Sequence, residues 1–298
     1  MSATLRRVRT ATLDIAYEES GAADGAPVFL MYGWPYDPRC YDEVIAPLCS
    51  AGARVIVPYL RGFGPTRFLS QETMRSGQQA ALGNDLREMM DALGVDRAVL
   101  AGYDWGGRAA CIVAALWPER VRGLVTVNSY NIQDIPGSAK PQSPEQERRF
   151  WYQWYFQTER GRAGLENNRG TLCRLLWELW SPHWQFDAAT FARSAVSFEN
   201  PDFVALTIHS YRHRYGNIAG DPKLEETEHR LAQKPKLTVP TIALQGDADG
   251  VLPPEASQRH AGFFTGPYQR HVLPRIGHNP PQEDPRAFAD AVLKIMQA

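Results

Sequence analysis

The sequence predicts an α/β protein with a mostly parallel central sheet, helices on both faces of that sheet and a helical cap insertion. Short apolar runs alternate with amphipathic stretches through the first 130 residues, as expected of strands that are buried on both faces and joined by helices. The composition then becomes aromatic and charged, and the alternation resumes at Pro235. We therefore expect residues 1–130 and 236–298 to form the α/β core and residues 131–235 to form the cap.

The strands of the first half are expected at its apolar runs. Residues 10–17 alternate apolar and polar side chains, which favours an early strand at one edge of the sheet. Continuous apolar runs favour strands covered on both faces at residues 28–31, 53–58, 97–100 and 121–127. Helices are expected between them, at residues 41–51, 78–93 and 109–116. The second of these has its leucines and methionines on one stripe and its charges opposite, which is typical of a helix packed on a sheet.

The middle of the chain has a different pattern. Residues 135–143 are rich in proline, glycine and serine and show no periodicity, so we expect a loop there. From residue 145 to about residue 230 the pattern is helical and rich in aromatic side chains. Because ligands bind at the carboxyl edge of open α/β sheets, we expect this cap to cover that edge. The remaining elements are expected at residues 241–244 (strand), 258–264 (helix), 271–273 (strand) and 285–296 (helix).

Composition excludes several classes of partner. The formal net charge is −1, which gives no electrostatic reason to expect nucleic acid or an anionic membrane as a partner. No window has the roughly eighteen uninterrupted apolar residues that a membrane-spanning helix needs. The first seventeen residues contain arginines but no apolar region, so we expect no signal peptide. The four cysteines lack metal-binding spacing, and we expect three of them to be reduced core residues of a cytoplasmic protein.

The most informative stretch is residues 101–108, with the sequence AGYDWGGR. An apolar strand enters it, a helix leaves it, and glycines stand on both sides of Asp104. This is the layout of a nucleophile elbow, a strained strand-to-helix turn that presents one side chain at its apex. Gly102 and Gly106 are small enough for such a turn, and Gly107 lets the helix approach the sheet. Taken alone, the stretch also fits an ordinary glycine-rich turn in which Asp104 caps the helix.

Two residues downstream complete a candidate catalytic set. Asp249 follows an expected strand and precedes a Val-Leu-Pro turn, and we prefer it to Asp247, which is closer to the strand. His278 lies on the loop after the last expected strand. These loops leave the same edge of the sheet as Asp104. The chain order of nucleophile, acid and histidine is that of the α/β-type hydrolytic triad.

An aspartate in the place of a serine changes the chemistry. A carboxylate has a reference pKa of about 3.9 and is ionised at neutral pH, so it needs no base to attack an sp³ carbon that bears a leaving group. Asp104 would form an alkyl ester. His278, oriented by Asp249, would then deprotonate a water that attacks the ester carbonyl. We expect the backbone N–H groups of Trp34 and Trp105 to form the oxyanion hole for this second step.

On these residues the chain resembles an α/β-hydrolase of the epoxide hydrolase branch over almost its whole length. Residues 102–107, Gly-Tyr-Asp-Trp-Gly-Gly, are close to the family's Gly-x-Asp-Trp-Gly-Gly motif, and residues 33–35, Gly-Trp-Pro, match the end of its His-Gly-aromatic-Pro loop. Residues 150–157 and 209–212 are similar to the two cap segments that hold the family's ring-opening tyrosines. The resemblance implies the α/β-hydrolase fold and hydrolysis of an epoxide to a vicinal diol.

The resemblance assigns the ring-opening role to Tyr152 and Tyr211. An epoxide opens to an alkoxide, which is a poor leaving group. Phenols have a reference pKa of about 10, so they stay neutral at pH 7 and can donate hydrogen bonds and a proton to that oxygen. From the cap they would face Asp104 from the opposite side; the alternative role of either ring is packing alone. The other pocket candidates of this segment are Tyr155, Tyr215 and Trp151.

One residue departs from the family pattern. Where the oxyanion loop of the family has a histidine that helps to order the loop, this chain has Tyr32. A bulkier phenol is expected to reshape the pocket or to shift Trp34. Tyr32 is therefore a further pocket candidate.

Besides a biosynthetic tailoring enzyme that uses the same site on one complex epoxide or a related electrophile, two other functions stay open. A dehalogenase uses the same aspartate ester but needs halide donors: Trp105 offers an indole N–H, whereas the haloalkane branch has asparagine where Trp34 stands. The fluoroacetate branch has arginine in place of Trp105, and only Arg108 resembles its second arginine. The other alternative is a non-catalytic protein that binds a small molecule on this fold.

The aromatic cap favours a small apolar or aromatic epoxide as the substrate. The expected chemistry requires no metal and no organic cofactor. A homodimer stays open.

Overall fold

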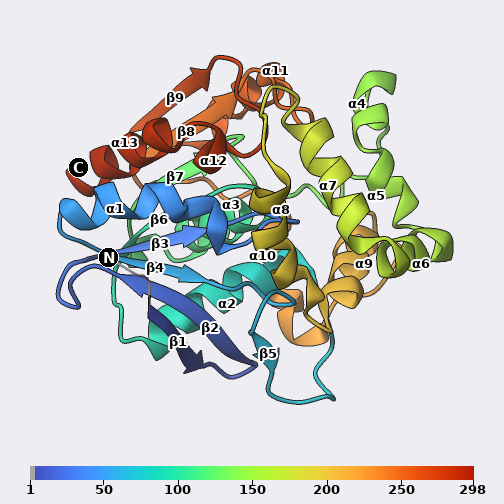
Figure 1. Cartoon of the computed structure of the whole chain (residues 1–298), viewed down its shortest axis with the longest axis horizontal. Helices are drawn as coiled ribbons and strands as arrows, with labels where there is room; N and C mark the ends of the chain where they lie inside the picture. The colour runs from blue at the N-terminus through green and yellow to red at the C-terminus, as the bar shows by residue number, and fades with distance from the viewer. Residues whose placement is uncertain (1–3) are drawn as a thin grey trace.

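The computed structural model describes residues 4–298 and has the α/β architecture that the sequence predicts (Figure 1). A single sheet has the strand order β1-β2-β4-β3-β6-β7-β8-β9, and the short strand β5 pairs with β2. β2 pairs antiparallel with β1, β4 and β5, and all neighbours from β4 to β9 are parallel. The strands are β1 Thr4–Arg9, β2 Leu13–Ser20, β3 Ala26–Met31, β4 Ala53–Pro58, β5 Arg67–Phe68, β6 Ala98–Gly102, β7 Val121–Val127, β8 Thr241–Gly246 and β9 Tyr268–Leu273.

Helices join the parallel strands and cover the two faces of the sheet. α1 packs beside α13, and α2 packs beside α3. The leucines and methionines of the predicted stripe on α2 are buried, at Leu82, Leu86, Met89 and Met90. The helices of the α/β part are α1 Asp42–Ser50, α2 Gln79–Ala92, α3 Asp104–Leu116, α11 Pro254–Gln258, α12 Pro280–Glu283 and α13 Pro285–Met296. α3 begins five residues earlier than its apolar pattern predicts, because its first turn is the polar and glycine-rich end of the elbow.

The edge of the sheet differs from the expectation. The alternating segment forms β2, but the edge position belongs to β1, which no sequence pattern predicted. β1 is exposed along nearly its whole length, so it has no apolar face for a periodicity to reveal. Its backbone ladder with β2 and an ion pair between Arg7 and Asp14 (2.8 Å) hold it in place. With β1 on one side and β4 on the other, β2 is an interior strand and is almost entirely buried.

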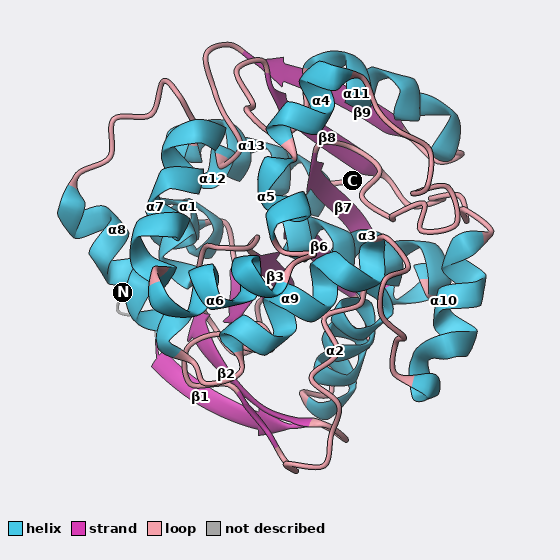
Figure 2. Cartoon of the chain, turned by 90° about the vertical axis from the view of Figure 1, so that its right-hand side faces the viewer, coloured by secondary structure: helices cyan, strands magenta, loops and turns pink. Residues whose placement is uncertain are grey.

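The segment between β7 and β8 consists of helices and loops, as expected. Figure 2 looks onto this side of the molecule, where α5, α6 and α9 lie in front of the ends of β3 and β6. The helices of the segment are α4 Pro144–Arg149, α5 Trp151–Tyr155, α6 Glu159–Asn167, α7 Arg169–Trp180, α8 Ala188–Ala195, α9 Phe203–Arg214 and α10 Glu225–Ala232. α10 lies against α2, where Glu228 accepts a hydrogen bond from the backbone N–H of Ala80 (3.0 Å). The domain limits at residues 130 and 236 stay a prediction.

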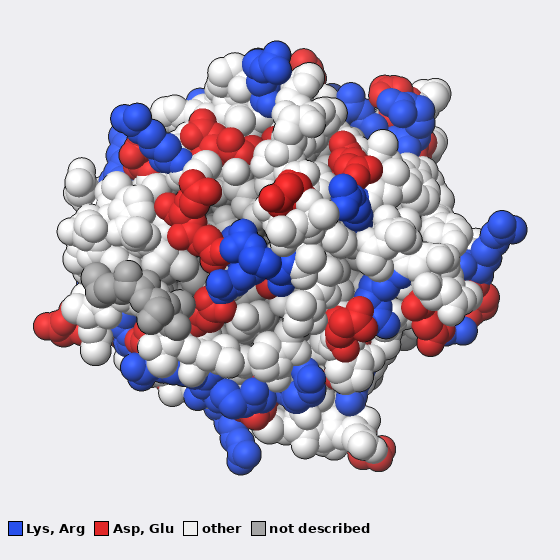
Figure 3. All heavy atoms as spheres, in the orientation of Figure 1, with Lys and Arg blue, Asp and Glu red and all other residues white. Residues whose placement is uncertain are grey.

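The face shown in Figure 3 carries both basic and acidic side chains, and basic ones gather along its lower edge. Within residues 4–298, no helix combines the length and the apolarity that crossing a membrane requires. All four cysteines are free. Cys40, Cys111 and Cys173 are buried, which confirms their expected place in the core.

Candidate active site

The sharp turn predicted around Asp104 is present. Asp104 is the first residue of α3 and has a φ of +48°, a left-handed conformation that non-glycine residues adopt rarely. The turn needs glycine at position 106, because a Cβ there would lie 2.1 Å from the backbone oxygen of Met31. The start of α3 thus lies tightly against the end of β3, with Asp104 at the apex of the turn. Strain of this kind is common where a side chain must be held for function.

The loop after β3 supplies a hydrogen bond to Asp104. The backbone N–H of Trp34 donates to Asp104 Oδ1 at 2.8 Å. Gly33 makes this approach possible, since a Cβ at that position would lie 2.5 Å from the Cβ of Asp104. Asp104 Oδ1 thus already accepts a hydrogen bond from one of the two backbone N–H groups that we expect to form the oxyanion hole. The contribution of the Trp105 N–H stays a prediction.

Asp249 is the acid that pairs with histidine. Its Oδ2 lies 2.9 Å from His278 Nδ1 and accepts a hydrogen bond from Asn128 Nδ2 at 2.8 Å. Its Oδ1 accepts from the backbone N–H groups of Val251 (2.7 Å) and Leu252 (3.1 Å). Asp249 is buried with both oxygens satisfied, so it is held as an acceptor for the imidazole. The alternative acid, Asp247, does not reach the histidine. It is exposed, and its Oδ1 accepts a hydrogen bond from the backbone N–H of Arg275 (2.5 Å).

His278 points from its loop toward the elbow. Its Nε2 lies 3.9 Å from Asp104 Oδ2, which is too long for a hydrogen bond. Its backbone N–H donates to the carbonyl of Trp180 (3.1 Å) and to the hydroxyl of Ser181 (3.2 Å), both at the end of α7. A segment more than ninety residues earlier in the chain thus fixes the histidine loop. The three side chains that the sequence singled out, Asp104, Asp249 and His278, are brought together.

The charges of the triad stabilise one another. Burial by itself lowers the pKa of His278, but the carboxylate of Asp249 and then that of Asp104 outweigh burial and raise this pKa to about 10. Burial raises the pKa of Asp104, yet interactions with His278, Arg108 and the Trp34 N–H hold it below the usual value. At neutral pH the free protein therefore carries an ionised Asp104 and a protonated His278.

This pairing predicts a pH dependence of stability. The pKa of His278 is about 10 in the folded protein and 6.5 as its ordinary value, so the stabilisation is complete below pH 6.5 and is lost as the pH rises toward 10. We expect the difference in unfolding free energy between the wild type and His278→Gln, measured by urea unfolding, to shrink from pH 6.5 to pH 10. A difference that stays constant over this range would show that the imidazolium is not stabilised by its carboxylates.

The two predicted tyrosines meet at the ring of Trp34. Tyr152 stacks on Trp34 at 6.2 Å between ring centroids, Tyr211 packs edge-on to it at 5.5 Å, and the two tyrosines lie 5.4 Å apart. Both are buried. Burial raises their pKa values, and the charge of Asp104 adds to this in each case. Both phenols are therefore neutral at pH 7.

Comparison with known proteins places this geometry in a family. A family model described as the alpha/beta hydrolase fold matches residues 26–285. The chain belongs to the α/β-hydrolase fold family. A crystal structure from Klebsiella pneumoniae subsp. pneumoniae MGH 78578, of a protein provisionally named an epoxide hydrolase, is 47% identical, with a TM-score of 0.97 over 99% of this chain and 98% of that one.

Curated relatives agree with the resemblance to the epoxide hydrolase branch, which is confirmed. Epoxide hydrolase A of Mycobacterium tuberculosis is 26% identical over 98% of this chain and 97% of its own length. A haloalkane dehalogenase of Mycobacterium marinum is 31% identical, but over 41% of this chain and 40% of its own length. The similarity to this curated epoxide hydrolase thus spans the α/β-hydrolase nearly from end to end, whereas the similarity to the dehalogenase covers less than half of it.

The other pocket candidates take different places in this α/β-hydrolase. Tyr215 donates a hydrogen bond to Gln153 Oε1 (2.8 Å), and Gln153 Nε2 donates to the hydroxyl of Tyr152 (3.0 Å). Tyr215 is therefore connected to Tyr152 through the side chain of Gln153. Trp151 packs edge-on to Tyr152 at 6.3 Å. The hydroxyl of Tyr155 lies against the backbone of α6, where a Cβ at position 164 would meet it at 1.8 Å.

Tyr32 orders a loop from within the core. It is fully buried, and its hydroxyl accepts a hydrogen bond from the backbone N–H of Leu60 (2.7 Å) in the loop after β4. Its ring packs edge-on to Phe63 at 5.5 Å. The phenol therefore ties the oxyanion loop to the neighbouring loop, and the N–H of Trp34 keeps its hydrogen bond with Asp104.

The loss of this tie is expected to destabilise the protein. Tyr32→Phe leaves the buried N–H of Leu60 without its acceptor, which typically costs about 1–3 kcal/mol. Urea unfolding measures the change. Tyr36→Phe is the matched control, because the hydroxyl of Tyr36 is also buried but has no hydrogen-bond partner among residues 4–298. Equal effects of the two substitutions would contradict the role of Tyr32.

Two supporting residues of the site were missed in the sequence. Asn128 follows β7 in a left-handed conformation (φ +63°) and holds Asp249, and Gln153 holds Tyr152. A polar residue directly after a buried parallel strand could have indicated Asn128, since such ends gather at the site. No comparable signal marks Gln153, which stands inside an aromatic run.

Proposed function

We propose that this α/β-hydrolase converts an epoxide to a vicinal diol through an ester on Asp104. The observation that carries the proposal is the arrangement at the elbow: an ionised carboxylate lies 3.9 Å from the imidazole of His278, and its charge acts on the buried phenols of Tyr152 and Tyr211. The similarity to proteins named as epoxide hydrolases supports the same reaction.

In the first step an oxygen of Asp104 attacks one carbon of the epoxide. The carbon–oxygen bond of the ring breaks as the bond to Asp104 forms. Tyr152 and Tyr211 hydrogen-bond to the leaving oxygen, and one of them transfers its proton to it. Tyr152 is suited to this, because its oxygen accepts from Gln153 Nε2 and its own proton stays available.

In the second step water cleaves the ester. Ester formation removes the negative charge of Asp104, which is one of the two charges that raise the pKa of His278. His278 then releases its proton, which replaces the one given by the tyrosine, and accepts a proton from the attacking water. The oxyanion at the former carboxyl carbon is stabilised by the N–H of Trp34 and, as we propose, that of Trp105. The bond between the former carboxyl carbon of Asp104 and the ester oxygen then breaks, and His278 returns its proton to that oxygen. The new carboxyl group of Asp104 reprotonates His278, and the diol leaves with an oxygen that belonged to Asp104.

One observation favours dehalogenation as the second candidate. The indole N–H of Trp105 is buried and has no hydrogen-bond partner among the described residues, so it is available to a halide. A second side-chain donor is missing at the position where the haloalkane branch has asparagine, because Trp34 Nε1 already donates to Thr207 Oγ1 at 2.8 Å. A panel of styrene-type and aliphatic epoxides beside haloalkanes and fluoroacetate, with diol and halide both measured, separates the two reactions.

A single turnover in water enriched in heavy oxygen tests the covalent step. We expect the label in the side chain of Asp104, found by mass spectrometry of its peptide, and an unlabelled diol. The peptide that contains Asp249 is the internal control and should stay unlabelled. A labelled diol with an unlabelled Asp104 would mean that water attacks the epoxide directly. A protein that binds epoxides without turnover would label neither.

A further inference from the structure

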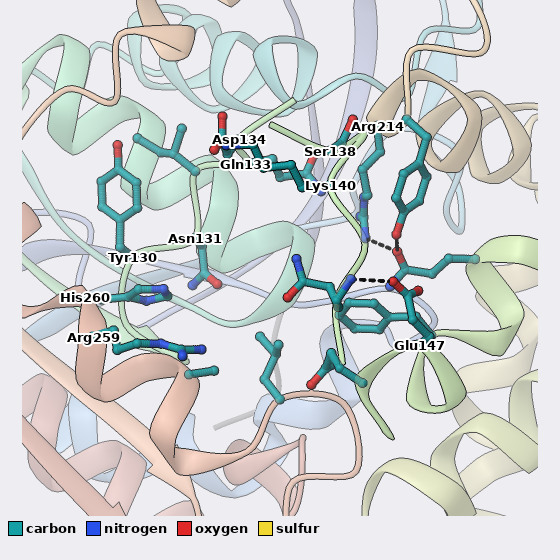
Figure 4. Close-up of a pocket in the computed structure, with 18 of the residues that line it drawn as sticks. Tyr130, Asn131, Gln133, Asp134, Ser138, Lys140, Glu147, Arg214, Arg259 and His260 are labelled. Atoms are coloured by element: carbon teal, nitrogen blue, oxygen red, sulfur yellow. Dashed lines mark hydrogen bonds between the residues drawn. The ribbon is translucent and has the colours of Figure 1, made fainter. Parts of the chain in front are cut away.

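A cavity of about 1140 Å³ lies beside the candidate active site, and the mechanism proposed above does not use its charged residues. It is bounded by the loop after β7, by α5, by the end of α9 and by the residues after α11. Figure 4 shows Arg214 on one side of this cavity and Arg259 with His260 on the opposite side.

Arg108 is the unusual residue of this cavity. It is 7% exposed, and its Nε has no hydrogen-bond partner among residues 4–298. Burial and the nearby charge of Arg214 lower its pKa to about 10, while the charge of Asp104 opposes them. A buried guanidinium without a matched partner is costly unless something else occupies its donors.

Arg214 offers a second guanidinium, whose side-chain hydrogen-bond partners are the neutral amides of Gln153 and Gln133. It is half-buried, lies 4.6 Å over the ring of Tyr211, and donates from Nη1 to the neutral amide of Gln153 at 3.1 Å. Two acidic residues that line the cavity have partners other than the arginines. Asp134 forms an ion pair with Lys234 at 2.7 Å, and Glu147 accepts a hydrogen bond from the indole of Trp154 at 3.0 Å. Glu255 is the remaining acid that lines it.

Helical spacing connects the two arginines to the reacting groups. Arg108 follows Asp104 by four residues on α3, and Arg214 follows Tyr211 by three residues on α9. Residues at these spacings lie on one face of a helix, about one turn or 5.4 Å apart. Nucleophile and proton donor are thus each followed, one turn further, by an arginine that lines the same cavity. A ligand that spans this distance would place one end at Asp104 and the other between the guanidinium groups.

We propose that the substrate is an epoxide that carries an anionic group, a carboxylate or a phosphate-like oxyanion, and that Arg108 and Arg214 bind this group in the cavity. The inference rests on the proposed epoxide hydrolysis. Two guanidinium forks suit either anion, since both present paired oxygens.

Turnover of matched substrates tests the proposal. ω-Epoxy carboxylic acids and ω-epoxy phosphonic acids of increasing chain length are compared with the neutral primary amides of the carboxylic acids. We expect kcat/KM for the best anion to exceed that for its amide by about 10- to 100-fold. Which anion is better, and at which chain length, identifies the source of the charge.

The variants are compared by one quantity, the ratio of kcat/KM for the anionic substrate to kcat/KM for its neutral amide. Arg108→Met and Arg214→Gln should reduce the preference for the anion by about tenfold or more, mainly through KM, and Arg108→Lys should restore part of it. Lys234→Gln is the matched control, because this lysine lines the cavity but already pairs with Asp134. Its substrate ratio should be that of the wild type. Urea unfolding of each variant verifies that the protein still folds.

A binding measurement separates this inference from the proposed function. In calorimetric titration of the wild type, hexanoate should bind more tightly than hexanamide, and the difference should vanish in Arg108→Met. Neutral epoxides that are turned over without any preference for anions would overturn the inference and leave the proposed function standing. Hexanoate binding without turnover of any epoxide would overturn the proposed function instead. Loss of the preference in Lys234→Gln alone would mean that the anion binds elsewhere.

Discussion

His278→Gln is expected to stop the reaction after the first step. The substitution removes the base that activates water but leaves Asp104 free to attack, so one equivalent of substrate should be consumed and then turnover should stall. Loss of a positioned general base typically slows the step that it serves by about 10²–10⁴-fold. Mass spectrometry of the intact protein should find one added substrate mass, and peptide analysis should place it on Asp104.

The matched control is His271→Gln, the same substitution at an exposed histidine of the strand that leads into the His278 loop. It should keep wild-type turnover and accumulate no ester. An inactive His278→Gln with an unmodified Asp104 would contradict the order of steps, because it would make the imidazole necessary for the attack itself. Normal turnover in His278→Gln would remove the histidine from the mechanism.

Replacing both cap tyrosines is expected to slow the first step of the reaction, in which the ester forms. Tyr152→Phe with Tyr211→Phe removes the hydroxyls that stabilise the leaving oxygen but keeps the rings stacked around Trp34. Each donor of this kind assists proton transfer in one step only, so ester formation should fall by about 10²–10⁴-fold. Stopped-flow measurements under single-turnover conditions should show little change in the rate of ester hydrolysis.

Tyr155→Phe serves as the control for this pair, since its ring belongs to the same helix, α5, and its hydroxyl lies against α6. It should leave both steps near the wild-type rate. If the double variant slowed both steps equally, the tyrosines would be acting on the shape of the pocket and not on the leaving oxygen. If Tyr155→Phe had the larger effect on ester formation, the ring-opening role would belong to that residue.

The elbow illustrates what a sequence can predict. Glycines around Asp104 and the strand and helix beside them are consequences of local sterics, and local sterics are written in adjacent residues. The same holds for the strands that bury both faces, whose apolar runs gave the positions of β4 and β7 without a shift. Asp249 and His278 could be found because parallel strands deliver their loops to one edge. The position of β1 could not be predicted, because this exposed edge strand is held by backbone hydrogen bonds to β2 and has no apolar pattern.

The sequence by itself determined the fold class and the chain order of the candidate triad, and its resemblance to epoxide hydrolases indicated the candidate tyrosines. Only the tertiary structure decided which side chains support them: Asn128 on Asp249, the carbonyl of Trp180 on the His278 loop, and Gln153 on Tyr152. It also decided that Arg108 and Arg214 share one cavity. The physical reason is that strand, turn and helix follow from neighbours in the chain, whereas hydrogen bonds and charge pairs form between segments that only packing brings together.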